Sequence, residues 1–393
     1  MIPIIKPALG DEEVSAVAEV LRSGWVTQGP KVSEFETAFA HYVGAAHAVA
    51  VSNCTAALHL ALVAAGVGEG DEVVTPSHSF VATANAIRYC GATPVFADVR
   101  PDTFNVDVAS VEACMSPRTR AILCVHQMGM PCELEALSAI ASAHGVWLVE
   151  DAACAIGSRF ARNGDWHYVG APVGKLACFS FHPRKLLTTG DGGMVTTDDA
   201  DLATRLRALR QHAMSVPDTT RHASARVTFE SYGELGFNYR MTDIQAAVGL
   251  PQLTRLDGLI ARRRATADRY RELLSSIPGL QTPYEPADVQ SNWQSYCVRL
   301  PPALSQVGVM QALLDAGVAS RRGIMCAHRE PAFANADWRS SAGPRDASAL
   351  SASESAQDEC ILLPLFDAMT DDEQQTVVDQ LAAACRSAPA SAT

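Results

Sequence analysis

Seven short apolar segments, separated by intervals of helical length, set the architecture of the first half of the chain. They span residues 46–51, 71–75, 94–98, 119–125, 146–150, 176–181 and 193–197. Continuous apolar runs of this length are typical of strands that are buried on both faces of a sheet. The intervals 55–65, 81–90, 107–114 and 133–144 are typical of helices. The alternation predicts an α/β fold with a mostly parallel seven-stranded sheet and helices on both faces.

Helical patterns flank this region. Val14, Val17, Ala18 and Leu21 recur at helical spacing between Asp11 and Arg22. Further helices are expected over 199–213 and over 242–276, where Pro251 should kink or break the second one.

The remaining segments complete the predicted organisation. An irregular excursion is expected over 214–232, and residues 293–384 mix short strands and helices. The segment 335–357 is rich in Ser, Ala, Asp and Gly, which predicts a surface loop. We therefore expect a large domain over residues 1–250 and a smaller C-terminal α/β domain over 251–393.

Charge and composition exclude several classes of function. The 393 residues carry a net charge of −12, which disfavours broad attraction to nucleic acid or to an anionic membrane. No apolar run is long enough for a membrane span, and the N-terminus MIPIIKPALGDEE does not resemble a signal peptide. The eleven cysteines include no C-x-x-C pair, which favours reduced thiols over a metal site. A cytoplasmic protein is expected.

Reactive residues follow three of the predicted strands. Ser52–Ala57 leads into a helix, where a hydroxyl and free N–H groups could bind phosphate or simply cap the helix. Asp151 follows the strand at 146–150, and Lys185, one of four lysines, follows the strand at 176–181 before a glycine-rich turn. Taken singly, the carboxylate could be a helix cap and the lysine a solvated surface charge. The carboxyl ends of parallel strands meet at one edge of a sheet, which is where ligands bind.

A phosphate cup, a carboxylate and a lysine at one sheet edge match the needs of pyridoxal phosphate. That cofactor needs its phosphate anchored, its ring nitrogen kept protonated by a carboxylate, and a lysine for covalent attachment. Phe80, at the start of the helix after the second strand, could cover the face of the ring.

At this point the chain resembles a known family, the DegT/DnrJ/EryC1/StrS aminotransferases, which act mainly on keto sugars. The resemblance spans nearly the whole chain and is carried by the stretches GWVTQGPKVSEFE, VSNCTAALHLAL, GDEVVTPSHSFVATANAI, GATPVFADVRPDTFNVD, EDAACAIGS, CFSFHPRKLLTTGDGGM and ELGFNYRMTDIQAAVG. It implies the aspartate-aminotransferase-like (type I) fold. It also implies a homodimer whose active sites are shared between subunits.

The resemblance also implies a role for each matching residue. Lys185 matches the lysine that binds pyridoxal phosphate and moves protons, and Asp151 matches the partner of the ring nitrogen. Phosphate contacts are implied for Thr55, the Ala56 N–H, Ser180 and, from the neighbouring subunit, Asn238, with Arg240 as a weaker candidate and Phe80 stacked on the ring. His328 is the best candidate for a substrate-facing residue, with a structural role as its alternative, and Arg240 is a second substrate candidate.

One position departs from the family. Many members carry glutamine near the ring hydroxyl, in EDAAQA, where this chain has Cys154. A thiol is a poor hydrogen-bond donor, so we expect that contact to be lost or replaced. The lysine-to-histidine change of the family's sugar dehydratases is absent, since Lys185 is present.

The resulting hypothesis is a two-step aminotransferase. An amino acid, glutamate or glutamine, would convert the cofactor to pyridoxamine phosphate. This form would then aminate a keto sugar, and the leading candidate is a nucleotide-linked deoxysugar. Alternatives are a keto-cyclitol aminotransferase, a pyridoxal-phosphate sugar dehydratase and a non-catalytic regulator with the same fold.

Overall fold

The structure, a computed structural model, describes residues 1–216, 227, 229–301 and 304–387. Helices and strands alternate regularly from residue 47 to residue 151. The helices are α1 (Asp11–Ser23), α2 (Pro30–Val43), α3 (Cys54–Ala64), α4 (Ala82–Tyr89), α5 (Val108–Cys114), α6 (Leu134–His144), α7 (Ala200–Leu209), α9 (Asp243–Thr254), α10 (Leu256–Leu274), α11 (Gln306–Asp315), α12 (Ser351–Glu359) and α13 (Asp371–Ser387). The longer strands are β1 (His47–Val51), β2 (Glu72–Pro76), β3 (Thr93–Ala97), β4 (Thr119–Val125), β5 (Trp147–Asp151), β6 (Arg159–Arg162), β7 (Asp165–Tyr168), β8 (Leu176–Ser180), β9 (Gly193–Thr197), β11 (Tyr296–Arg299) and β15 (Cys360–Leu363). Much of the excursion expected over 214–232 lies outside the described residues.

All seven predicted strands form one sheet, in the order β1-β9-β8-β5-β4-β2-β3. The five strands from β8 to β3 are parallel, while β9 runs antiparallel to both of its neighbours. The expected α/β fold with a mostly parallel central sheet is therefore confirmed.

The sheet is wider than the predicted seven strands. The short strands β13 (Arg339–Ser340) and β14 (Gly343–Pro344) form a hairpin, and β13 pairs in parallel with β3, which gives nine strands. The expectation of a surface loop over 335–357 is wrong at both ends, because this segment contains the hairpin and the first part of α12. Strands of two residues leave no periodic pattern to detect.

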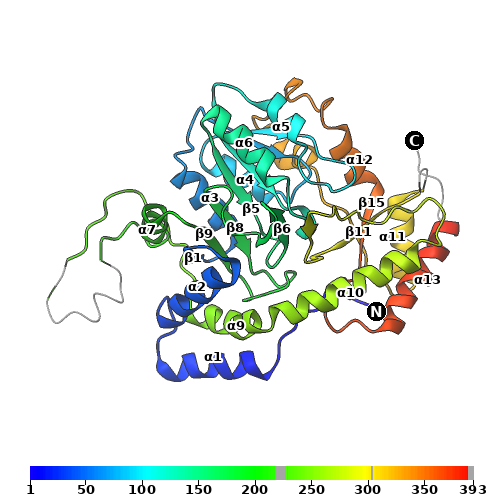
Figure 1. The fold of residues 1–393 in the computed structure, drawn as a ribbon, viewed down its shortest axis with the longest axis horizontal. Helices are drawn as coiled ribbons and strands as arrows, with labels where there is room; N and C mark the ends of the chain where they lie inside the picture. The colour runs from blue at the N-terminus through cyan, green and yellow to red at the C-terminus, as the bar shows by residue number, and fades with distance from the viewer. Residues whose placement is uncertain (217–226, 228, 302–303, 388–393) are drawn as a thin grey trace.

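Alternate residues of each strand face opposite sides of the sheet, and each side has its own core. Ala48 and Ala50 pack with α2 on one side, whereas Val49 and Val51 pack with α3 and α7 on the other. Figure 1 shows the resulting arrangement of helices on both faces of the central strands. The loops at the carboxyl ends of the strands remain free to form a site.

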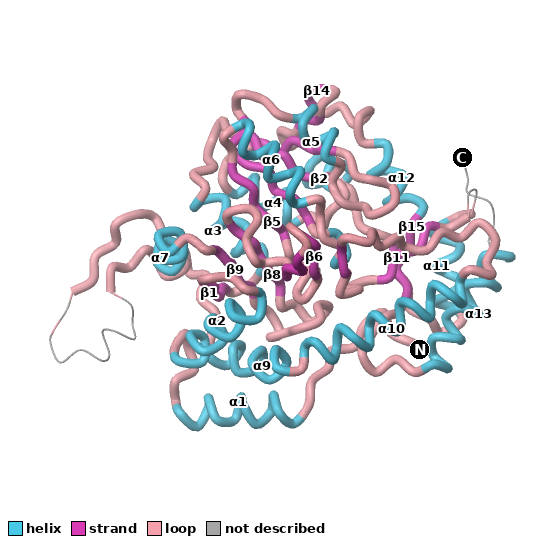
Figure 2. The backbone as a smooth tube through the Cα atoms, viewed as in Figure 1, coloured by secondary structure: helices cyan, strands magenta, loops and turns pink. Residues whose placement is uncertain are grey.

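The C-terminal part contains a second, smaller sheet. Its strand order is β11-β15-β12, where β12 is Arg321–Arg322, and its core is shared with α10, α11 and α13. A third sheet, also small, joins β6 and β7 to β10 (Val289–Gln290). In Figure 2, α10 runs from α9 toward this C-terminal part. The predicted domain boundary at residue 250 stays a prediction.

The long helical region is divided into two helices, as expected, but the break does not lie at Pro251. Pro251 lies inside α9, and the break comes at Arg255, between α9 and α10. Within the described residues, no helix combines the length and the apolar character that crossing a membrane would require.

Candidate active site

A cavity of about 290 Å³ lies at the carboxyl ends of the central strands. It is lined by residues that follow β1, β2, β4, β5 and β8, and closed on the far side by side chains such as Ile5, Gln294 and Leu365. Thr55, Phe80, Asp151, Ser180 and Lys185 all line it, although they are far apart in the sequence. The cavity thus brings together five of the residues that the sequence singled out.

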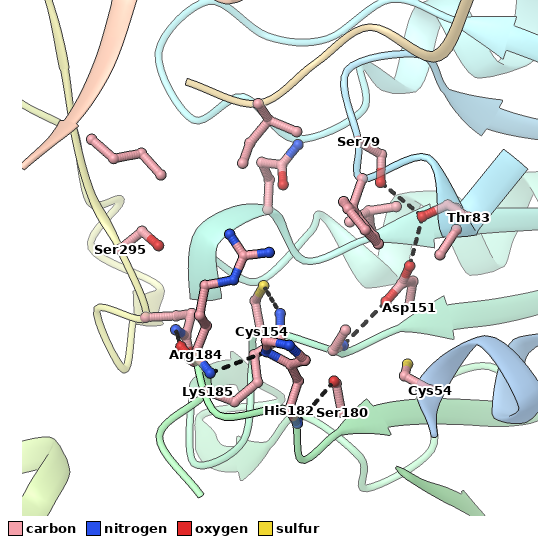
Figure 3. A pocket seen from close by; sticks show the side chains of 18 of the residues that line it. Cys54, Ser79, Thr83, Asp151, Cys154, Ser180, His182, Arg184, Lys185 and Ser295 are labelled. Atoms are coloured by element: carbon pink, nitrogen blue, oxygen red, sulfur yellow. Dashed lines mark hydrogen bonds between the residues drawn. The ribbon is translucent and has the colours of Figure 1, made fainter. Parts of the chain in front are cut away.

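Asp151 is a buried carboxylate that faces this cavity. Only 5% of the residue is exposed. Its Oδ2 accepts a hydrogen bond of 2.8 Å from Thr83 Oγ1, and its Oδ1 accepts one of 3.1 Å from the Ala153 N–H. Ser79 Oγ lies 2.8 Å from Thr83 Oγ1 and extends the chain of hydroxyls shown in Figure 3.

The charge of Asp151 lacks a direct counterion among the described residues. Burial raises the pKa of its carboxyl, and the hydrogen bonds from Thr83 and Ala153 and the more distant Lys185 offset this only in part. A cationic group that entered the cavity would stabilise the carboxylate. Asp151 therefore fits the partner of a protonated ring nitrogen.

Lys185 lies in a turn that the C-terminal part of the chain holds in place. Its N–H donates to His182 O at 2.8 Å. Gln294 clamps the turn from the other side: its Nε2 donates to Arg184 O at 2.6 Å, and its Oε1 accepts from the Leu186 N–H at 3.2 Å. This role of Gln294 could not be predicted from the sequence, because its partners are more than a hundred residues away.

The amine of Lys185 contacts the residue at which this chain departs from the family. Lys185 Nζ donates to Cys154 Sγ at 2.9 Å (Figure 3). Burial lowers the pKa of the amine, but the neighbouring Cys154 sulfur, followed by Cys54 and Asp151, raises it, and the net shift is upward.

The predicted phosphate cup is formed in part. Thr55 and Ser180 line the cavity. The Ala56 N–H instead donates to Asn53 Oδ1 at 2.8 Å, so Asn53 caps α3. Gly193 allows the close approach of β9 to this helix start, since a Cβ there would lie 2.6 Å from the Asn53 carbonyl carbon. Two hydroxyls beside the N-terminus of α3 fit a phosphate group.

Three other predicted residues lie outside the cavity of this chain. Asn238 is exposed and Arg240 half-buried, in a segment whose Tyr239 carbonyl accepts from the Ser52 N–H at 2.8 Å. His328 is buried, with Nδ1 2.6 Å from Ser77 Oγ and Nε2 3.1 Å from Glu354 Oε1. Both of its ring nitrogens are therefore engaged, which favours the structural alternative for His328.

Comparisons with known proteins identify a family for this chain. The sequence model of the DegT/DnrJ/EryC1/StrS aminotransferase family matches residues 7–382. The chain is 38% identical over 379 residues to the spore coat polysaccharide biosynthesis protein SpsC of Bacillus subtilis (strain 168), covering 96% of this chain and 95% of SpsC.

Solved structures agree as well. The aminotransferase TlmJ from Streptoalloteichus hindustanus is 36% identical, with a TM-score of 0.87 over 98% of this chain and 99% of TlmJ. The PLP-form of the putative sugar aminotransferase Spr1654 from Streptococcus pneumoniae is 27% identical, with a TM-score of 0.88 over 98% of each chain. With Lys185 and Asp151 facing one cavity at the sheet edge, these matches place the chain in the DegT/DnrJ/EryC1/StrS family of aminotransferases.

Proposed function

We propose that this chain is a pyridoxal-phosphate-dependent aminotransferase that moves an amino group from glutamate or glutamine to a keto sugar. The leading candidate for that sugar is a nucleotide-linked deoxysugar. The observation that carries the proposal is the cavity shared by Lys185 and the buried, only partly compensated carboxylate of Asp151. The names of SpsC and Spr1654 support the sugar assignment.

Each cavity residue has a part in the proposed reaction. When bound, pyridoxal phosphate supplies a carbonyl that takes up the amino group and a ring that withdraws electrons. Lys185 attaches the cofactor and, once released, carries protons at its Nζ. Asp151 keeps the ring nitrogen protonated, Thr55 and Ser180 donate to the phosphate, and Phe80 covers the ring.

Two arginines support a substrate that carries negative charge. Arg184 and Arg321 both line the cavity, from the turn after β8 and from β12. Neither forms an ion pair with any residue that the structure describes, whereas Arg255 and Arg329, for example, each pair with carboxylates. A free guanidinium suits the phosphates of a nucleotide-linked sugar or the carboxylate of the amino donor.

A single-turnover experiment tests the substrate class. Enzyme in the amino form of its cofactor is mixed with a keto-sugar nucleotide, a keto-cyclitol or pyruvate, and recovery of the aldehyde-form absorbance is followed. We expect the keto-sugar nucleotide to react roughly 10²-fold faster than pyruvate, because polar contacts to hydroxyls reject analogues that lack them. Fast reaction with the cyclitol alone would favour the cyclitol alternative. Reaction with pyruvate and with neither cyclic ketone would disprove the sugar assignment.

We further propose a homodimer in which Asn238 reaches the phosphate bound in the neighbouring subunit. Its exposed position outside this chain's own cavity supports the proposal. The cytoplasmic location and the absence of nucleic-acid and membrane partners stay predictions from composition.

Mixed dimers test the shared site. Lys185→Ala and Asn238→Ala are each expected to be impaired in pure form, and the two proteins are then allowed to exchange subunits. If the site is shared, a mixed dimer has one doubly damaged site and one intact site, so roughly a quarter of wild-type activity should return. Subunit exchange is confirmed by mass spectrometry of tagged subunits. If activity then does not recover on mixing, Asn238 acts in the active site of its own subunit.

A further inference from the structure

The contact between Lys185 and Cys154 is a feature of the cavity that the proposed function does not use. Cys154 Sγ, at 2.9 Å, is the one hydrogen-bond partner that the Lys185 amine has among the described residues. The two side chains come from different loops, after β8 and after β5, and both line the cavity. If Cys154 only filled space, its sulfur would not need to contact the Lys185 amine.

One segment of the chain fixes both halves of this contact. Asn292 Nδ2 donates to Cys154 O at 2.9 Å and to Ile156 O at 2.8 Å, which holds the loop of Cys154. Asn292 Oδ1 accepts from the Gln294 N–H at 2.8 Å, and Gln294 clamps the turn of Lys185. The approach of sulfur to nitrogen is therefore built into the framework behind the cavity.

We propose that Cys154 is a positioning residue, whose sulfur holds the Lys185 amine at the cavity wall whenever that amine is not bound to the cofactor. The inference rests on the proposed function, because it assigns Lys185 the role of the cofactor lysine. In a transamination the lysine must leave the cofactor and return to it, so an amine that turned away would slow both half-reactions.

The contact also governs the charge of the amine. Burial alone would favour the neutral amine, and Cys154 is the leading group that counters it. The other groups that act on the amine are Cys54 and Asp151, and the remaining ionisable residues of the cavity are His182, Arg184, Asp191 and Arg321. Removing the sulfur should therefore lower the pKa of Lys185 and leave more neutral, reactive amine near neutral pH.

The test uses the enzyme freed of cofactor, so that it does not depend on turnover. Amines are labelled with trace acetic anhydride between pH 7 and 10, and the rate at Lys185 is read by peptide mass spectrometry against exposed Lys175 in the same sample. In Cys154→Ala the relative rate at Lys185 at pH 8 should rise by about three- to tenfold, since one pKa unit corresponds to a factor of ten. Cys154→Val, which keeps the bulk of the side chain but offers no acceptor to the amine, should move the rate in the same direction.

The control is Cys90→Ala, which removes a half-buried thiol that does not line the cavity. An unchanged Lys185 rate in Cys154→Ala, or an equal rise in Cys90→Ala, would overturn the proposal. The valine variant decides the question if the alanine variant does not fold. Failure of the proposed function is seen separately, as absence of a covalent bond between Lys185 and pyridoxal phosphate in the wild type.

Discussion

Lys185→Ala should reduce turnover by roughly 10⁴-fold, because it removes both the covalent attachment of the cofactor and the group that carries protons. The variant should still bind pyridoxal phosphate without a covalent bond, since Thr55, Ser180 and Asp151 remain. Steady-state turnover measures the loss, and the visible spectrum after gel filtration measures retained cofactor. Borohydride reduction of the wild type, followed by peptide mapping, should place the label on Lys185.

Lys175→Ala is the matched control for this experiment. Lys175 is exposed just before β8 and does not line the cavity. Its variant should keep wild-type turnover. A borohydride label on Lys175, or substantial activity in Lys185→Ala, would show that the cofactor lysine has been assigned wrongly.

Asp151→Asn should reduce turnover by about 10²- to 10³-fold, because a neutral amide cannot stabilise a protonated ring nitrogen. The fold should survive the change. Asparagine keeps the size of the side chain and an oxygen to accept from the Ala153 N–H, and the Thr83 hydroxyl can rotate to accept from the new NH₂ group. Undiminished turnover in Asp151→Asn would remove Asp151 from the mechanism.

The same variant should stabilise the cofactor-free protein. Burial raises the pKa of Asp151 in the folded chain, so its contribution to stability is most favourable below the unfolded value and falls as pH rises through the folded pKa. At pH 7 the carboxyl of Asp151 is ionised in the unfolded chain, so its burial in the folded chain is unfavourable, and asparagine removes this cost. Thermal unfolding should show a higher Tm for Asp151→Asn at pH 7 and a smaller difference at pH 4. Asp165→Asn, at an exposed carboxylate of β7, should show neither change.

The central fold could be predicted because its signals are local. Each buried strand is a short apolar run, and the connections from β1 to β5 are helices. Helix α2 was not predicted, although its buried residues Val32, Phe35, Phe39 and Val43 recur at helical spacing after Pro30. The stabilisation of its first turn could not be seen, because Asp243, more than two hundred residues away, accepts hydrogen bonds from Gly29, Lys31 and Val32.

The same distinction between local and long-range signals applies to the site residues. The residues directly after strand ends could be predicted, because parallel strands bring their carboxyl ends to one edge. The hydroxyl of Thr83 on Asp151, the sulfur of Cys154 on Lys185 and the clamp from Gln294 depend on side chains that meet only after folding. His328 shows the opposite case, in which a suggestive residue is held in a buried network away from the cavity.

The β13–β14 hairpin gives the C-terminal region a protective role. β3 would otherwise be the outermost strand of the central sheet, with one row of N–H and C=O groups open to strands of other molecules. Arg339 and Ser340 pair with Val95 and Phe96 and occupy part of that row. Because the cover comes from the far end of the sequence, a ribosome releases β3 long before its cover exists. The nascent chain therefore passes through a period in which self-association competes with folding.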